Sequence, residues 1–357
     1  MILQKIILTR FKNYTNGSFT FDPKFNCIVG LNGSGKTNLL DAIYYLCMCK
    51  SNFGLNDALL VQHEQSFFRL EGYFNEGESV QKIVAKYTNK KKEFEKNDVT
   101  YNLLLEHIGK FPVVMITPDD NYILMENSEE RRRFLDNLIC QIDEQYLHDL
   151  MQYNKILKNR NAALKQMHSS NLEEILCVYD EQMLPLASYV YEKRKYWHTI
   201  IIDSLSNFYN DISDYKEVIS LTYESMLHEN DFIIGMLKNR QKDIALQRTN
   251  FGIHRDDLSL KIDNQPLKKF GSQGQIKSFI IALKLVQFHI LKQETEIMPL
   301  LILDDLFDKL DNNRVTKLLK ILSTTEYGQI FISNTNKGVL EQILQSNEQS
   351  YKFIEME

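Results

Sequence analysis

The chain has 357 residues, of which 43% are hydrophobic and 25% are charged, a composition typical of globular proteins. This length favours about two domains, and glycine and proline are too scarce for a disordered chain. The formal net charge of −5 excludes a surface that is basic overall, so any contact with nucleic acid has to come from local basic patches.

The sequence gives no sign of a membrane or secreted protein. No apolar run approaches the roughly 18 residues that a membrane helix needs, so we expect no membrane contact. Residues 1–14 alternate in polarity and then become charged, which favours a strand over a secretion signal. The five cysteines are scattered without metal-ligand spacing: Cys27, Cys47, Cys49, Cys140 and Cys177. We therefore expect reduced thiols and a cytoplasmic protein.

The first part of the chain predicts strands and one helix. Strands are expected over residues 2–9 and near 18–21, and FNCIVG at 25–30 predicts a short buried strand. A helix is expected from about Lys36 to Cys49, because its apolar residues recur at helical spacing. The segments FFRLEGYF, VQKIVAKY and VTYNLLL then predict an antiparallel sheet layer, and FPVVMITPDD predicts another short strand.

The loop GLNGSGKT at 30–37 matches G-x-x-x-x-G-K-[ST] in full and lies between a predicted strand and a predicted helix. Its glycines let backbone N–H groups turn inward around phosphates, and the helix N-terminus adds positive charge. Lys36 is expected to reach the β- and γ-phosphates of ATP, and the Thr37 hydroxyl to bind Mg²⁺. A plain glycine turn, the alternative, does not require the Lys-Thr pair. The expected nucleotide-binding residues here are Gly30, Leu31, Asn32, Gly33, Ser34, Gly35, Lys36, Thr37 and Asn38.

A change of composition marks the middle of the chain. From Ser128 to about Asn239, residues of helical preference dominate and recur at helical periods, which predicts a block of several helices. The block is too short for long coiled-coil arms. Glycine returns after about residue 246, where a strand, a turn at Asp263-Asn264 and a helix over 272–292 are expected.

The segment KFGSQGQIKSF at 269–279 opens that helix, and two interpretations of it stay open. Ser272 and Gln275 form an S-x-x-Q capping box, which is a purely structural explanation. Ser272, Gly274 and Gln275 also form the Ser-x-Gly-Gln signature pattern of ABC-type ATPases. In that pattern, the serine and the helix N-terminus bind the γ-phosphate held by another copy, which predicts an ATP-dependent homodimer.

The segment LLILDDLFDKLD at 300–311 predicts a buried parallel strand with acids at its C-terminal end, where open parallel sheets bind ligands. Asp304 is the expected Mg²⁺-linked carboxylate, and Asp305 is expected to hold or activate the attacking water. Together with Lys36 and Ser272, Asp305 completes the set of catalytic candidates. Acids at a simple strand end are the alternative. A helix over 312–323 and a buried strand QIFIS follow.

Several stretches resemble the RecF family of SMC- and ABC-like ATPases, in order along nearly the whole chain. They are LTRFKNY at 8–14, ITPDDNYILMENSEERRRFLD at 116–136, RTNFGIHRDDL at 248–258, SQGQIK at 272–277 and LLILDDLFDKLD at 300–311. Two positions depart from the family pattern. Ile253 stands where proline is frequent, and Lys277 stands where arginine is common, which keeps the charge but not the bidentate geometry.

The resemblance implies an α/β fold: an ABC/SMC-like P-loop ATPase head assembled from both chain ends, with an inserted helical lobe. The expected domains are 1–125 and 246–357 for the two halves of the head, and 126–245 for the lobe. ATP and Mg²⁺ are the implied cofactors.

The resemblance also implies a function in recombinational repair and replication restart. An ATP-induced dimer would bind single-stranded and gapped duplex DNA without sequence preference and assist recombinase loading with RecR- and RecO-like partners. Slow ATP hydrolysis would time release. An SMC-like structural ATPase head and a small-molecule P-loop kinase are the alternatives.

Three groups of basic residues are candidates for contacts with DNA phosphates. They are the lysines Lys82, Lys86, Lys90, Lys91, Lys92 and Lys96, the arginines Arg131, Arg132 and Arg133, and the group Lys193, Arg194 and Lys195. Solvated hairpins and intramolecular ion pairs, with Asp119, Asp120 or Asp136 as partners of the arginines, are the alternative explanations.

Overall fold

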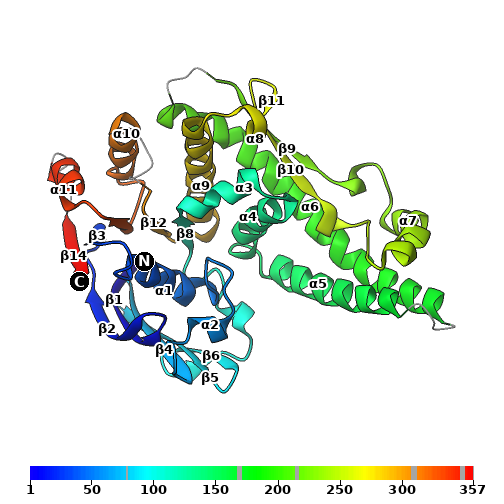
Figure 1. Ribbon diagram of the computed structural model, residues 1–357, viewed down its shortest axis with the longest axis horizontal. Helices are drawn as coiled ribbons and strands as arrows, with labels where there is room; N and C mark the ends of the chain where they lie inside the picture. Colours follow the sequence, from blue (N-terminus) through cyan, green and yellow to red (C-terminus); the bar gives the residue numbers. More distant parts are fainter. Residues whose placement is uncertain (78, 167–170, 214–216, 307–311, 346–349, 357) are drawn as a thin grey trace. The chain divides into compact units, whose positions relative to one another are not determined.

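The computed structural model describes residues 1–77, 79–166, 171–213, 217–306, 312–345 and 350–356. The chain divides into two compact units (Figure 1). Unit 1 comprises Met1–Asp120, Phe208–Tyr215 and Lys277–Glu357, and unit 2 comprises Asn121–Asn207 and Lys216–Ile276.

Unit 1 contains two sheets. The antiparallel sheet has the order β2-β1-β4-β5-β6-β7, with strands Tyr14–Thr20, Ile2–Phe11, Phe67–Glu76, Ser79–Thr88, Lys91–Lys96 and Val99–Thr100. The parallel sheet has the order β14-β3-β13-β12-β8, with strands Tyr351–Met356, Phe25–Gly30, Ile330–Asn334, Leu300–Leu303 and Val113–Ile116. Because β3 pairs with β13 and β14, strands from the two ends of the chain are direct neighbours, which confirms the sheet predicted from both ends.

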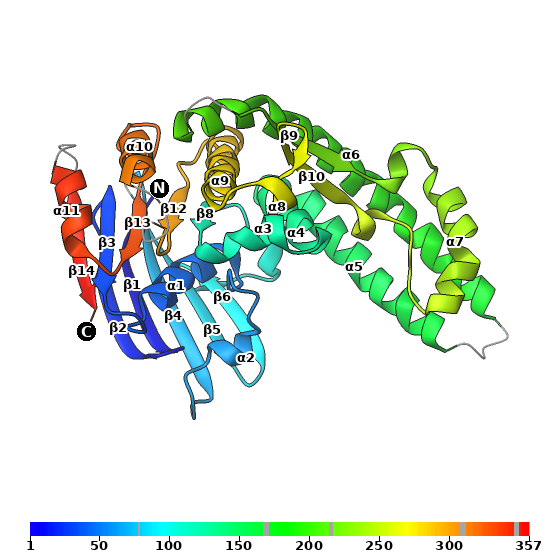
Figure 2. The same ribbon diagram turned by 45° about the horizontal axis from the view of Figure 1, so that its top comes forward.

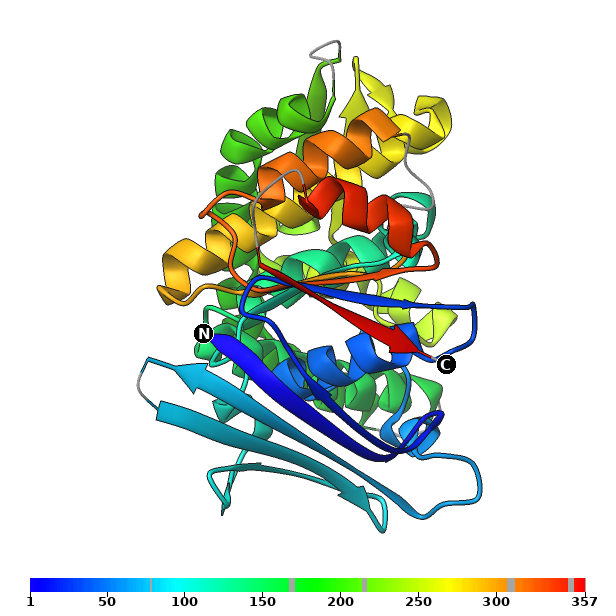
Figure 3. The ribbon, with the colours of Figure 1, turned by 90° about the vertical axis from the view of Figure 1, so that its left-hand side faces the viewer.

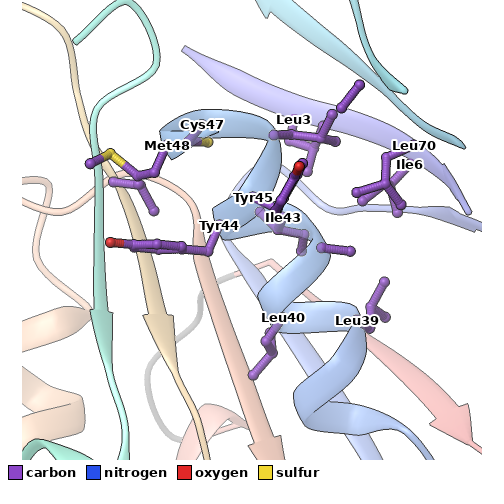
Figure 4. Close-up of a cluster of buried hydrophobic side chains, with 14 of the residues drawn as sticks. Leu3, Ile6, Leu39, Leu40, Ile43, Tyr44, Tyr45, Cys47, Met48 and Leu70 are labelled. Atoms are coloured by element: carbon purple, nitrogen blue, oxygen red, sulfur yellow. The ribbon is translucent and has the colours of Figure 1, made fainter. Parts of the chain in front are cut away.

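The helix α1, Lys36–Met48, contacts strands of both sheets and is buried on nearly every side. Figure 4 shows Leu3 and Ile6 of β1 and Leu70 of β4 beside it. A helix that is apolar all round requires such complete cover. The core between the sheets therefore fixes the N-terminus of α1, and with it the loop that precedes the helix.

Other helices of unit 1 cover the opposite face of the parallel sheet, as Figure 3 shows for α10 and α11. They are α9 (Gln273–Thr295, its first turn in unit 2), α10 (Asn312–Leu322) and α11 (Lys337–Gln345). The short helix α2 (Asp57–Leu60) precedes β4 and lies beside the antiparallel sheet. The sequence did not indicate α11 or β14. On length and composition alone α9 passes as a membrane span, contrary to the expectation above, but 78% of its apolar window is buried within the protein, as in a core helix.

Unit 2 is mainly helical, as predicted. Its helices are α3 (Tyr122–Met125), α4 (Ser128–Cys140), α5 (Glu144–Lys165), α6 (Leu172–Ile212, its last turn in unit 1), α7 (Phe232–Leu246) and α8 (Leu267–Phe270). A sheet β11-β10-β9, with strands Gln265–Pro266, Asp257–Ile262 and Ile219–Glu224, lies along α6 (Figure 2). The predicted helical block did not include β9, although ISLTYE alternates between buried and exposed residues.

The boundaries of the compact units differ from the expected domains in three stretches, of which 121–125 lie in unit 2 and 208–213 lie in unit 1. Residues 246–276, expected with the second half of the head, lie in unit 2, because β10 pairs with β9 along its whole length. The end of the Asp-Asp stretch, residues 307–311, lies outside the described residues.

Candidate nucleotide-binding site

The loop between β3 and α1 has the backbone that a phosphate cradle needs. Gly33 and Gly35 have φ angles of 86° and 101°, in the left-handed region that favours glycine. A Cβ atom on Gly35 would lie 2.5 Å from Nδ2 of Asn13. Glycine at this position therefore serves both the turn and the close approach of Asn13.

Two polar groups of this loop fit a phosphate ligand. Lys36 is buried and its Nζ donates to the carbonyl oxygens of Gly30 at 2.9 Å and Leu31 at 3.1 Å. The hydroxyl of Ser34 is buried and has no hydrogen-bond partner in the described part of the chain. A buried ammonium and an unpaired hydroxyl at a helix N-terminus match the donors that a phosphate chain requires.

The structure brings Thr37 and Asp304 together from distant parts of the sequence. Thr37 Oγ1 donates to Asp304 Oδ1 at 3.0 Å, at the C-terminal end of β12. Burial raises the pKa of the Asp304 carboxyl, and hydrogen bonds from Ser333 and Thr37 oppose that rise. Two hard oxygen ligands fit Mg²⁺, which binds few protein oxygens when phosphate and water supply the rest. No cluster of three or more His, Cys, Asp or Glu side chains suited to a metal occurs among the described residues.

Asp305 adopts a left-handed backbone with φ of 42°. Its N–H donates to Ser333 Oγ at 2.8 Å, and the same hydroxyl lies 2.7 Å from Asp304 Oδ1. The sequence did not single out Ser333. The only feature of the sequence that points to Ser333 is that the buried strand QIFIS ends with a polar residue.

The turn between β1 and β2 also contacts the phosphate loop. The sequence analysis did not assign this turn to the site. The hydroxyl of Tyr14 donates to the carbonyl oxygen of Gly35 at 3.0 Å, and burial raises the Tyr14 pKa. Asn38 Nδ2 donates to Asn13 Oδ1 at 2.7 Å. The motif LTRFKNY, which carries both turn residues, was the available signal.

The predicted signature residues lie in unit 2 at the start of α9. The backbone N–H of Ser272 donates to Gln275 Oε1 at 2.7 Å, and the N–H of Gln275 donates to Ser272 Oγ at 3.2 Å. The capping box is therefore present. The side chain of Gln275 also donates to Glu217 at 3.0 Å. Ser272 is exposed, and its hydroxyl oxygen acts here as an acceptor.

Most of the candidate DNA-binding arginines bind carboxylates within unit 2 instead. Arg131 forms two hydrogen bonds with Asp257, at 2.6 and 3.0 Å. Arg194 is buried and binds Asp136 at 3.0 Å and Asp256 at 2.8 Å. Arg194 is thus wrong as a candidate for phosphate contact, because its five donors face inward.

The lysine-rich strands are also partly neutralised. Lys82 pairs with Asp98 at 3.1 Å, Lys86 with Glu95, and Lys92 with Asp57 at 2.9 Å. The exposed cations that remain of these candidates include Lys90, Lys91 and Lys195.

Comparison with known proteins gives a family match along almost the whole chain. Residues 2–354 match the model of the RecF/RecN/SMC N-terminal domain. The DNA replication and repair protein RecF of Flavobacterium johnsoniae is 41% identical, with 100% of both chains covered. The protein of the same name from Phocaeicola vulgatus is 40% identical over 100% of this chain and 97% of its own.

Solved structures give the same picture. The structure titled as the recombination mediator protein RecF-ATPrS in the RecFOR pathway is similar with a TM-score of 0.87 and 29% identity, covering 99% of this chain and 96% of that one. Its counterpart titled RecF-ATP has a TM-score of 0.87 and 31% identity, covering 94% and 92%. An Smc head domain from Pyrococcus furiosus, at TM-score 0.57 and 15% identity, shares the fold alone.

Proposed function

The chain belongs to the RecF/RecN/SMC family and, within it, to the RecF proteins; from this premise we propose that it is an ATP-dependent DNA-binding protein of DNA replication and recombinational repair. The solved relatives RecF-ATP and RecF-ATPrS support ATP as the ligand of the loop at residues 30–37.

One observation carries the proposal: the 3.0 Å hydrogen bond from Thr37 to Asp304. It joins a phosphate loop to an acid at the end of a parallel strand, the arrangement that P-loop ATPases use. Burying a carboxylate costs free energy, and a glycine turn that binds no ligand would not require a buried carboxylate beside it. The contact therefore supports a nucleotide site built from both chain ends.

The residues of this site have separable roles. The Lys36 ammonium and the loop N–H groups bind and orient the phosphates, and Thr37 with Asp304 would hold Mg²⁺, which neutralises phosphate charge when bound. Asp305 orients or deprotonates the attacking water. Its carboxylate is one methylene shorter than a glutamate, so we expect slow hydrolysis that serves as a release timer.

Dimerisation and DNA binding complete the proposal. Ser272, Gly274 and Gln275 of one copy bind the γ-phosphate held by Lys36 of a second copy, so that two ATP molecules join a two-fold dimer. The dimer binds single-stranded and gapped DNA without sequence preference and works with RecR- and RecO-like partners in the cytoplasm. In this proposal the functional head comprises 1–125 and 246–357, of which 246–276 belong to compact unit 2, and the lobe comprises 126–245.

Light scattering tests the proposal directly. The measured molar mass should double when ATP and Mg²⁺ are added. With ADP it should stay at the value of a monomer. Gapped DNA should bind more tightly with ATP than with ADP. Lys36→Ala should bind no nucleotide and stay monomeric, because it removes the charge that holds the phosphates. A wild-type protein that binds no ATP would exclude this function.

A further inference from the structure

The end of β13 occupies the centre of the nucleotide site. In the parallel sheet, β13 lies between β3, which leads into the phosphate loop, and β12, which ends at Asp304. Ser333 is fully buried on this strand, and its hydroxyl faces the first residues after β12. The buried hydroxyl therefore contacts the Asp-Asp pair at the C-terminal end of β12.

The hydroxyl of Ser333 makes two hydrogen bonds of opposite sense. It donates to Asp304 Oδ1 at 2.7 Å and accepts from the backbone N–H of Asp305 at 2.8 Å. A longer contact of 3.2 Å reaches Asp305 Oδ1. One side chain thus binds both members of the Asp-Asp pair.

The second bond has a conformational consequence. Asp305 has φ of 42°, in the left-handed region that is unfavourable for a residue with a Cβ atom. The bond from its N–H to Ser333 holds this backbone. The direction of the Asp305 carboxylate therefore depends on Ser333.

The first bond bears on the metal ligand. Thr37 and Ser333 both donate to Asp304 Oδ1. If Thr37 held Mg²⁺ through its hydroxyl oxygen, the Thr37 bond to Asp304 would weaken, whereas the bond from Ser333 to Asp304 would not be affected. Ser333 would then be the side chain that keeps Asp304 in place while the cation is bound.

We propose that Ser333 is a positioning residue, which fixes Asp304 toward Mg²⁺ and Asp305 toward the attacking water at the same time. This inference rests on the proposed ATPase function. It assigns to the end of β13 a role that links metal binding with water activation.

Three variants test it. Ser333→Ala removes only the oxygen, and Ser333→Thr keeps the hydroxyl. The control is Ser278→Ala on α9, whose hydroxyl is also fully buried but has no hydrogen-bond partner in the described chain. Urea titration first establishes that each variant is folded.

The readouts separate nucleotide binding from metal binding and from turnover. Calorimetry measures ATP affinity in EDTA, electron paramagnetic resonance measures Mn²⁺ bound to the protein–ATP complex, and steady-state assays give kcat. Ser333→Ala should keep ATP affinity in EDTA, while Mn²⁺ affinity and kcat each fall about tenfold or more, the size expected for a lost hydrogen bond to a charged group. For Ser333→Thr and Ser278→Ala, Mn²⁺ affinity and kcat should each stay within about threefold of the wild-type values.

Two outcomes would overturn the inference. One is a Ser333→Ala protein with wild-type Mn²⁺ affinity and kcat. The other is equal loss in Ser333→Ala and Ser278→Ala, which would indicate general loosening of the core. Failure of wild-type protein to bind ATP in the presence of Mg²⁺ would instead overturn the proposed function, because that measurement uses no Ser333 variant.

Discussion

The buried arginine of α6 offers a quantitative test of what stabilises unit 2. Arg194 is 2% exposed and donates to Asp136, Asp256, Tyr146 and the carbonyl oxygen of Ile253. Arg194→Met keeps much of the apolar stem but removes the charge. It leaves the Asp256 carboxylate, 1% exposed, without its cation.

The expected loss of unfolding free energy is about 3–5 kcal/mol, the usual cost of removing one partner from a buried ion pair. That is a large part of the roughly 5–15 kcal/mol that stabilises a typical protein. The neighbouring Lys193, 36% exposed, pairs with Asp143 at 2.6 Å at the surface. Lys193→Met is the matched control and should cost less than about 1 kcal/mol.

The protein carries its own probe for this measurement. Its single tryptophan, Trp197, is buried one turn along α6 from Arg194, so tryptophan fluorescence reports on unit 2. Urea titrations followed by this signal give the free energies. If Arg194→Met unfolds within about 1 kcal/mol of wild type, the ion cluster does not stabilise unit 2 as argued here.

Three further predictions follow from the site and the core. Ser272→Arg should bind ATP as a monomer with wild-type affinity yet form no ATP-induced dimer in light scattering; normal dimers would refute the role of Ser272 across the interface. Steady-state turnover should stay below about 10 s⁻¹, and faster hydrolysis would contradict the argument from the short Asp305 carboxylate. Burial lowers the pKa of His107 from 6.5 to about 4, so the folded state favours neutral His107 and loses stability as the pH falls from 6.5 to 4. His107→Gln, which keeps a donor for the Leu46 carbonyl, should remove up to about 3 kcal/mol of that pH dependence in urea titrations; identical slopes would contradict it.

The sequence predicted the parts of the site that depend on local pattern. The loop from Gly30 to Thr37 is recognisable because its glycines, lysine and threonine all serve one ligand. Asp304 was recognisable because an acid directly after a run of buried apolar residues falls at the ligand-binding edge of a parallel sheet. Their convergence at 3.0 Å followed from sheet topology that these motifs imply.

What the sequence did not indicate depends on tertiary contacts. Ser333 and Tyr14 are ordinary residues by composition and gain their place only because β13 and the β1–β2 turn pack beside the loop. The arginines at 131 and 194 looked like surface cations, but their partners Asp257 and Asp256 lie more than sixty positions away in the chain. Charge patterns alone do not distinguish a buried pair from a phosphate-binding surface.

The shared nucleotide site can be tested by mixing two variants. Lys36→Ala lacks a working phosphate loop, and Ser272→Arg lacks a working signature helix, so neither should dimerise alone with ATP. In an equimolar mixture, the loop of the Ser272→Arg copy meets the intact signature of the Lys36→Ala copy, which restores one complete site for each pair. Light scattering with ATP should therefore show dimers in the mixture and none in either variant alone. A mixture that stays monomeric would contradict a triphosphate held between two copies.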